Sequence, residues 1–317
     1  MKIVITGALG HIGSRLIRAL PVIYPEATIV MLDNLSSQRY CSLFDLPAYG
    51  RYQFIELDIL KEDLADSFRG ADAVLHLAAI TNAADSFGIS EQVELVNYAG
   101  TEKVAQACLQ EGCPLIFFST TSVYGTQKDI VDEDCSLDEL KPQSPYAESK
   151  MKAELLLKRL GETQGLHFII GRLGTIFGTS PGMRFHTAVN KFCWQATLGK
   201  PITVWRTALH QYRPYLDLAD AVEAVEFILK RKLYDNHVYN ILTCNATVNE
   251  ILQVIAIHIP DLSIHYVDKE IMNQLSYHVS NKRFNNMGFE FKGDLYKSIK
   301  ETLDMLKGIR KEGKQCQ

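Results

Sequence analysis

The opening stretch Met1–Gly13, which reads MKIVITGALGHIG, decides the fold. Residues Lys2–Thr6 form a short, mostly apolar run that is rich in β-branched side chains, which is typical of a strand buried on both faces. Three glycines follow in a G-x-x-G-x-x-G spacing, and helical periodicity begins directly afterwards; they are Gly7, Gly10 and Gly13. Such a turn can hold a pyrophosphate, because glycines permit a tight turn and a close backbone approach. The glycines alone also fit an ordinary strand–helix connection, so later motifs must decide.

Length and composition limit the classes of protein. A chain of 317 residues with 47% hydrophobic residues can bury a large core in one large or two modest domains. The net charge of −4, without a basic patch interleaved with aromatics, argues against a nucleic-acid partner. No apolar run approaches the roughly 20 residues of a membrane span, and the N-terminus lacks the features of a signal peptide. We therefore expect no membrane association.

The cysteines indicate a reducing compartment. There are seven of them, an odd number, and no C-x-x-C pair occurs. We therefore expect reduced thiols in a cytoplasmic protein, with neither a disulfide framework nor a metal site.

Further apolar runs predict a sheet. Strands are expected at Thr28–Leu32, Tyr52–Leu57, Ala73–Leu77, Leu115–Ser119 and Ile169–Leu173, and a long amphipathic helix at residues 90–111. Strands alternating with helices at short spacing imply a parallel, doubly wound α/β sheet with helices on both faces. Ligands of such sheets bind beyond the C-terminal strand ends. His76, inside the fourth strand, is interpreted as a satisfied core histidine.

Asp33 is the residue that favours one dinucleotide cofactor over another. It stands at the end of the second strand, where a carboxylate can accept hydrogen bonds from the adenosine ribose hydroxyls and would repel a 2′-phosphate. This position favours NAD over NADP. The alternative is that Asp33 only caps a turn, because Asp-Asn-Leu-Ser-Ser is a sequence typical of turns. Arg39 is near enough to keep NADP as a weak alternative.

The fifth strand and the next helix carry candidate catalytic groups. Four hydroxyl residues, 119–122, follow LIFF at the predicted ligand edge. Further on, Ser144 can cap a helix that has Pro145 at its first position. Tyr146 and Lys150 share one face of that helix because they are four residues apart. An ammonium near a phenol lowers the pKa of the phenol from about 10, so the sequence predicts a Tyr146 base usable near neutral pH.

Taken in order, these motifs resemble the extended short-chain dehydrogenase/reductase family, and within it the NAD-dependent nucleotide-sugar epimerases and dehydratases. The segments that carry the resemblance are TGALGHIG, LDNLSS, LDI, HLAA, STTSVYG and PYAESK. The resemblance implies that Tyr146 is the general base and that Lys150 holds the nicotinamide ribose and lowers the Tyr146 pKa. It also implies that Thr120 positions the sugar hydroxyl, because it stands four residues before Tyr124 of Val-Tyr-Gly.

The family also implies the contacts of the cofactor, NAD, and a homodimer. The predicted cofactor contacts are Gly7, Gly10, His11, Ile12, Asp33, Asn34, Asp58, Ile59, Leu77, Ala78, Ala79, Asn97, Tyr146 and Lys150. In many relatives the helices corresponding to residues 90–111 and 144–164 form the interface between two subunits.

The loop before Tyr124 separates reaction types within the family. Dehydratases carry an acid in this loop, where the chain has Thr121 and Ser122. The resemblance therefore implies epimerisation of a nucleotide-diphosphate sugar through a transient keto-sugar. The alternatives are a keto-sugar reductase or sugar dehydrogenase using NAD(P), and, less favoured, a 4,6-dehydratase or a non-catalytic NAD-binding regulator.

The second half of the chain supplies the expected substrate contacts. By resemblance these are Thr121, Thr175, Arg184, Trp205 and Arg213. Trp205 suits stacking on the nucleotide base, with a core position as its alternative, and Arg213 suits the diphosphate. The family pattern is not followed at Thr175, Pro214 and Asn285; Arg283 is a possible substitute for the phosphate-binding arginine expected at position 285.

Two regions are expected from this division of tasks. Residues 1–174 form a Rossmann-type NAD-binding domain, with a returning segment at about 221–243. Residues 175–317 form mainly a smaller C-terminal α/β lobe for the substrate.

Overall fold

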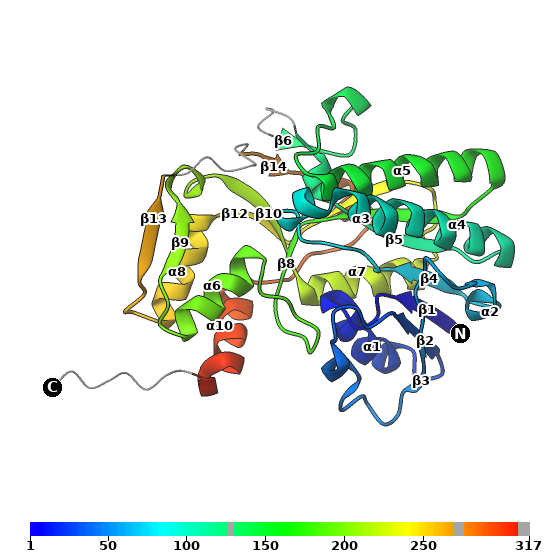
Figure 1. The fold of residues 1–317 in the computed structure, drawn as a ribbon, viewed down its shortest axis with the longest axis horizontal. Coiled ribbons are helices and arrows are strands. Elements are labelled where there is room, and N and C mark those ends of the chain that lie inside the picture. The colour runs from blue at the N-terminus through cyan, green and yellow to red at the C-terminus, as the bar shows by residue number, and fades with distance from the viewer. Residues whose placement is uncertain (126–129, 269–275, 310–317) are drawn as a thin grey trace.

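The computed structural model describes residues 1–125, 130–268 and 276–309. Its centre is a parallel sheet of seven strands in the order β11-β7-β5-β4-β1-β2-β3 (Figure 1). The strands are β1 (Lys2–Thr6), β2 (Thr28–Asp33), β3 (Arg51–Glu56), β4 (Ala73–His76), β5 (Leu115–Thr120), β7 (Phe168–Leu173) and β11 (Val238–Ile241). The predicted doubly wound fold is confirmed.

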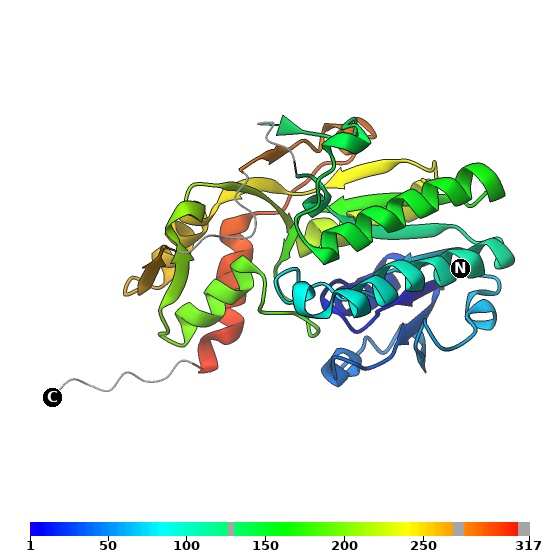
Figure 2. The same ribbon diagram turned by 45° about the horizontal axis from the view of Figure 1, so that its top comes forward.

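Helices cover both faces of this sheet. On one face α1 (His11–Ile23) packs on α7 (Leu218–Arg231) over a core that includes Ile5 and Ile17. On the other face α2 (Ala65–Phe68), α4 (Gly100–Glu111) and α5 (Pro145–Gln164) enclose a second core. Figure 2 shows α4 and α5 side by side along the sheet. Strands buried on both faces explain the continuous apolar runs of the sequence.

The helix predicted at residues 90–111 is interrupted. It consists of α3 (Ser90–Glu94), a π-helical turn at Leu95–Ala99 and then α4. Asn97 lies within the wide turn. Its amide contacts the backbone N–H and C=O of Ile80 at 2.8 and 2.9 Å and the Ser149 hydroxyl at 3.0 Å. The π-turn therefore ties the loop after β4 to α5.

A smaller part of the molecule lies beside the C-terminal strand ends (Figure 1). It contains a three-stranded sheet, a pair of parallel strands and three helices around a third core. Its elements are β8 (Thr175–Phe177), β10 (Tyr212–Asp217), β12 (Cys244–Thr247), β9 (Ile202–Trp205), β13 (Ile264–Val267), α6 (Ala188–Thr197), α8 (Val248–His258) and α10 (Leu295–Leu306). The short strands β6 (Ile130–Val131) and β14 (His278–Val279) pair, and α9 (Lys282–Asn286) follows.

Within the described ranges, no helix is both long and apolar enough to cross a membrane. The six cysteines that the structure describes are free thiols. His76 is fully buried and contacts the hydroxyls of Thr6 and Thr101 at 2.7 and 3.0 Å, which confirms its interpretation as a core histidine.

Candidate active site

A cavity of about 650 Å³ opens where the sheet strands end. Sixteen of the predicted site residues line it: Gly7, Gly10, His11, Ile12, Asp33, Asn34, Asp58, Ile59, Leu77, Ala78, Ala79, Thr120, Tyr146, Lys150, Thr175 and Arg184. The predicted cofactor contacts and catalytic groups thus meet in one space, since parallel strands carry their C-terminal ends to the same edge of the sheet.

The glycine loop is built for a close approach. Gly7 has φ +66°, and a Cβ there would lie 2.6 Å from the backbone nitrogen of Ala78. A Cβ on Gly13 would lie 2.6 Å from the carbonyl oxygen of Ala8. Gly10 begins α1 without a side-chain cap, and no acid occupies the first turn of that helix. The free N–H groups and positive dipole end of α1 therefore fit a diphosphate.

His11 adds an unused polar atom to the same wall. Its Nε2 contacts the carbonyl oxygen of Gly178 at 2.8 Å, and burial lowers its pKa to about 3, so the ring is neutral. Nδ1 is buried and has no partner within the described part of the chain. A cavity-lining acceptor left without a donor fits a bound ligand here.

The Asp33 side chain is fixed at the cavity by two backbone donors. Its carboxylate accepts hydrogen bonds from the backbone N–H groups of Leu9 and Leu35, both at 3.0 Å. Asp33 lines the cavity, and its carboxylate has further lone pairs that can accept hydrogen bonds from a ligand. Arg39 lines the same cavity, with its Nη1 3.7 Å from where a Cβ of Gly10 would be. With the glycine loop, this arrangement of donors and acceptors fits NAD.

The candidate catalytic groups come from β5 and α5. Thr120 ends β5, and its hydroxyl oxygen accepts a hydrogen bond from the Ser122 N–H at 3.1 Å. Ser144 caps α5 by accepting from the Ala147 N–H at 3.2 Å, as predicted. Tyr146 and Lys150 both reach the cavity from the first turns of this helix. Lys150 is only 3% exposed, with its Nζ 4.6 Å from the centre of the Phe117 ring.

The pKa values of this pair differ from the sequence prediction. Burial raises the pKa of Tyr146, against smaller lowering effects of the Arg184 charge and a hydrogen bond with Thr120. Burial also lowers the pKa of Lys150 to about 7, and the Glu154 carboxylate opposes that shift. The sequence prediction considered the ammonium next to the phenol but not the loss of water around both groups.

Four predicted contacts lie outside the cavity lining. The Thr121 hydroxyl is buried and donates to the carbonyl oxygen of Leu173 at 3.1 Å. Asn97 holds the loop after β4, as described above. Trp205 ends β9 and is 46% exposed. Arg213 donates to the Tyr212 carbonyl and the Gln211 side chain, each at 2.9 Å. The ligand contacts of these four residues remain predictions, as do the substrate contacts of Thr175 and Arg184.

The two residues considered for the missing phosphate contact also lie elsewhere. Arg283 pairs with Asp134 and donates to the carbonyl oxygen of Val238 at 3.4 Å. The Asn285 amide contacts Asn281 at 3.2 Å. Neither side chain lines the cavity.

The loop that follows β8 packs against the start of α1, a contact that the sequence did not predict. Ser180 donates to the His11 carbonyl at 2.8 Å, and the Gly182 N–H donates to the Ser14 hydroxyl at 2.9 Å. This loop delivers Arg184, which hydrogen-bonds to Thr81, and His186, which also lines the cavity. The sequence GTSPG signals a loop but gives no sign of what it contacts.

A dinucleotide-type loop, a carboxylate after the second strand and a Thr–Tyr–Lys set in one cavity define the protein class as a short-chain dehydrogenase/reductase. Within this class, the chain belongs to the NAD-dependent epimerase/dehydratase family, whose model matches residues 3–241. The resemblance noted in the sequence is confirmed, and NAD is confirmed as the cofactor at the level of the family.

Known relatives agree with this assignment. A trifunctional UDP-glucose 4,6-dehydratase/UDP-4-keto-6-deoxy-D-glucose 3,5-epimerase/UDP-4-keto-L-rhamnose-reductase of Arabidopsis thaliana is 31% identical over 322 residues, covering 96% of the chain and 47% of that protein. An uncharacterised UDP-glucose epimerase of Bacillus subtilis is 29% identical over 282 residues, covering 85% and 86%. The chain spans about half the length of the first curated relatives it matches.

Solved structures share the whole fold. A mutant UDP-glucuronic acid 4-epimerase from Bacillus cereus, in complex with UDP-4-deoxy-4-fluoro-glucuronic acid and NAD, superposes with a TM-score of 0.86 at 25% identity. The match covers 98% of this chain and 100% of that one.

Proposed function

We propose that the protein epimerises a nucleotide-diphosphate sugar through a transient keto-sugar. Bound NAD would supply the chemistry of accepting a hydride and returning it. Tyr146 removes the proton of the reacting hydroxyl and later gives it back, as general acid–base catalysis requires. Lys150 stabilises the Tyr146 phenolate, and Thr120 orients the hydroxyl.

In the part of the chain that the structure describes, no acid stands beside this set, which favours epimerisation over dehydration. Among the described residues, the carboxylates that line the cavity are those of Asp33, the last residue of β2, and Asp58, which follows β3. Loss of water after oxidation needs a further acid or base near the keto-sugar. The Thr121 hydroxyl is engaged with Leu173, and Ser122 carries no carboxyl group. This is the observation that carries the choice, since relatives include both epimerases and dehydratases.

The test is a panel of UDP-, GDP-, CDP- and dTDP-sugars incubated with the purified protein. We expect one or more sugars to be converted to an epimer without net formation of NADH, because the cofactor is regenerated in each turnover. Products are separated by chromatography while absorbance follows NADH. A keto-sugar lacking one water would identify a dehydratase instead, and stoichiometric NAD(H) turnover would identify a reductase or dehydrogenase.

We further propose a homodimer through the helices of residues 90–111 and 144–164. Support comes from exposed apolar side chains on packed elements of this region, Leu95 on the π-turn and Leu155 on α5, at 53% and 39% exposure. Changing both to glutamate should shift the protein from dimer to monomer in analytical ultracentrifugation, because burying the charges would be costly. Ile257→Glu, on α8 and 63% exposed, should leave the dimer intact. A monomeric parent protein, or a dimer that survives the double change, would contradict this interface.

The remaining proposals concern location and the division of tasks. The free thiols of the described cysteines support a reducing, cytoplasmic location. We assign NAD binding to residues 1–174 with the returning segment at about 221–243, and sugar binding mainly to 175–317. The pairing of β11 with β7 supports the returning segment.

A further inference from the structure

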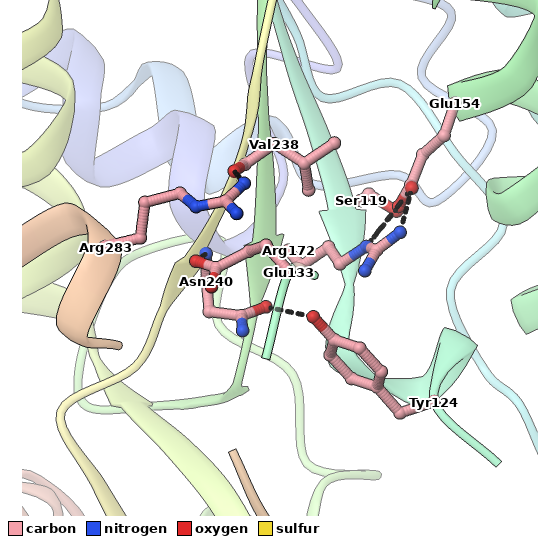
Figure 3. Close-up of polar contacts among 8 residues, drawn as sticks. All are labelled: Ser119, Tyr124, Glu133, Glu154, Arg172, Val238, Asn240 and Arg283. Carbon is pink, nitrogen blue, oxygen red and sulfur yellow. Dashed lines mark hydrogen bonds and ion pairs between the residues drawn. The ribbon is translucent and has the colours of Figure 1, made fainter. Parts of the chain in front are cut away.

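A buried carboxylate lies one helical turn behind the candidate lysine. Glu154 is 2% exposed and follows Lys150 by four residues on α5, so both side chains lie on one helix face. Its carboxylate accepts a 2.5 Å hydrogen bond from the Ser119 hydroxyl. Arg172 of β7 donates to it through Nε, at 3.0 and 3.1 Å, and through Nη2, at 2.6 Å (Figure 3). Glu154 thus joins α5 to β5 and β7.

The polar contacts of Arg172 continue to Tyr124 and, through it, to Asn240. The guanidinium of Arg172 lies 4.9 Å from the centre of the Tyr124 ring, whose hydroxyl donates to Asn240 of β11 at 2.9 Å (Figure 3). The Asn240 amide in turn donates to the carbonyl oxygen of Ser280 at 2.9 Å. Arg172 is therefore fixed from both sides, by Glu154 and by the tyrosine.

Stability alone does not account for the ion pair. Desolvation of two buried charges largely offsets their attraction, and apolar residues of equal volume often stabilise a core as well or better. The pair lies directly beneath the candidate catalytic groups: Ser119 precedes Thr120 in β5, and Glu154 follows Lys150 in α5. Its location points to a role in the site.

A nearby negative charge stabilises the ammonium form of the buried Lys150. Its ammonium is buried against the Phe117 ring, and burial disfavours the charged form. Burial lowers the pKa of Lys150 to about 7, even though the Glu154 charge raises it. Without that charge, the lysine would lose its proton at a lower pH. A neutral amine cannot stabilise the phenolate of Tyr146.

We propose that Glu154 is a positioning residue that keeps Lys150 in its ammonium form and fixes the Ser119–Thr120 end of β5. Arg172 pairs with the Glu154 carboxylate and holds it in its orientation. The inference rests on the proposed function, because it assigns Glu154 a task through Lys150 and Tyr146 in that reaction.

The test measures the ionisation of Lys150 in the NAD-loaded protein without a sugar. Lysines carrying a 13C label at Cε are titrated with pH by NMR, and the Lys150 signal is identified by its loss in Lys150→Met. Glu154→Gln alone would leave Arg172 buried and unpaired, so it is combined with Arg172→Met or Arg172→Gln. We expect the Lys150 pKa to fall by at least about one unit in either double variant, because the Glu154 charge no longer favours the buried ammonium.

A matched control removes an exposed carboxylate nearby. Glu94→Gln breaks the 2.8 Å pair with Lys152, a half-exposed residue of the same helix, and should leave the Lys150 pKa unchanged. Glu154→Asp, which moves the charge back by one methylene, should give an intermediate shift. If the double variants do not fold, this variant decides.

An unchanged Lys150 pKa in a folded, NAD-binding double variant, or in Glu154→Asp if that variant decides, overturns the inference. A lower melting temperature with an unshifted titration would reduce Glu154 to a structural role. Failure of the proposed function has a different signature. In that case no sugar of the panel is converted by the parent protein, while the pKa shift between parent and variant is still observed.

Discussion

Tyr146→Phe should lower the turnover of the sugar substrate by about a hundredfold to ten-thousandfold, the range of a lost general acid–base group. The change removes one hydroxyl and leaves the ring, so the shape of the cavity is retained. NAD binding should persist, because the glycine loop and Asp33 lie on other elements. Turnover is measured on the sugar identified by the panel. To measure how much NAD stays bound, the purified protein is unfolded and the absorbance of the released cofactor is read.

The control for this change is another tyrosine hydroxyl outside the site. Tyr24 follows α1, and its hydroxyl makes a long 3.5 Å contact with the carbonyl oxygen of Glu226. Tyr24→Phe should leave turnover within about twofold, as a surface-type change far from the cavity does. Full activity of Tyr146→Phe would remove the residue from the catalytic assignment, and equal losses in both variants would point to general destabilisation.

Features that depend on local sequence could be predicted. The strands of the sheet, the glycine loop and the capped start of α5 follow from periodicity, glycine spacing and Ser144-Pro145. The topology then brings Thr120, Tyr146 and Lys150 together, because strand ends of a parallel sheet meet at one edge.

Features that depend on contacts distant in sequence could not be predicted. Ser180 and Gly182 reach His11 and Ser14 across more than 160 positions, and no local pattern records such a contact. The same holds for Glu154, which reads as an ordinary helix-surface acid until β5 and β7 bury it. The predicted lowering of the Tyr146 pKa is wrong in direction for the same reason, because burial raises this pKa and burial is a property of the folded chain.

Gly7→Ala should abolish NAD binding and lower the free energy of unfolding by about 3 kcal/mol, as the sum of backbone strain and a steric clash. Its φ of +66° is unfavourable for alanine, and the new Cβ would lie 2.6 to 2.8 Å from backbone atoms of Leu77 and Ala78. These atoms directly follow β4, and the Leu77 N–H donates to the carbonyl oxygen of Thr6 at 3.0 Å, so they are backbone atoms held in place and cannot move away like a flexible side chain.

Gly70→Ala separates the two contributions. Gly70 has nearly the same φ, +69°, but nothing lies within 4 Å of a Cβ at that position. Alanine there should cost only the strain, about 1 kcal/mol, and NAD binding should be unaffected. Urea unfolding and NAD titration of both variants make the comparison. Equal losses of unfolding free energy would mean that backbone strain alone explains the glycine at position 7. A larger loss in Gly7→Ala means that the close approach of this backbone to Leu77 and Ala78 also requires glycine. Such a close approach is expected of a loop that brings its backbone next to a diphosphate.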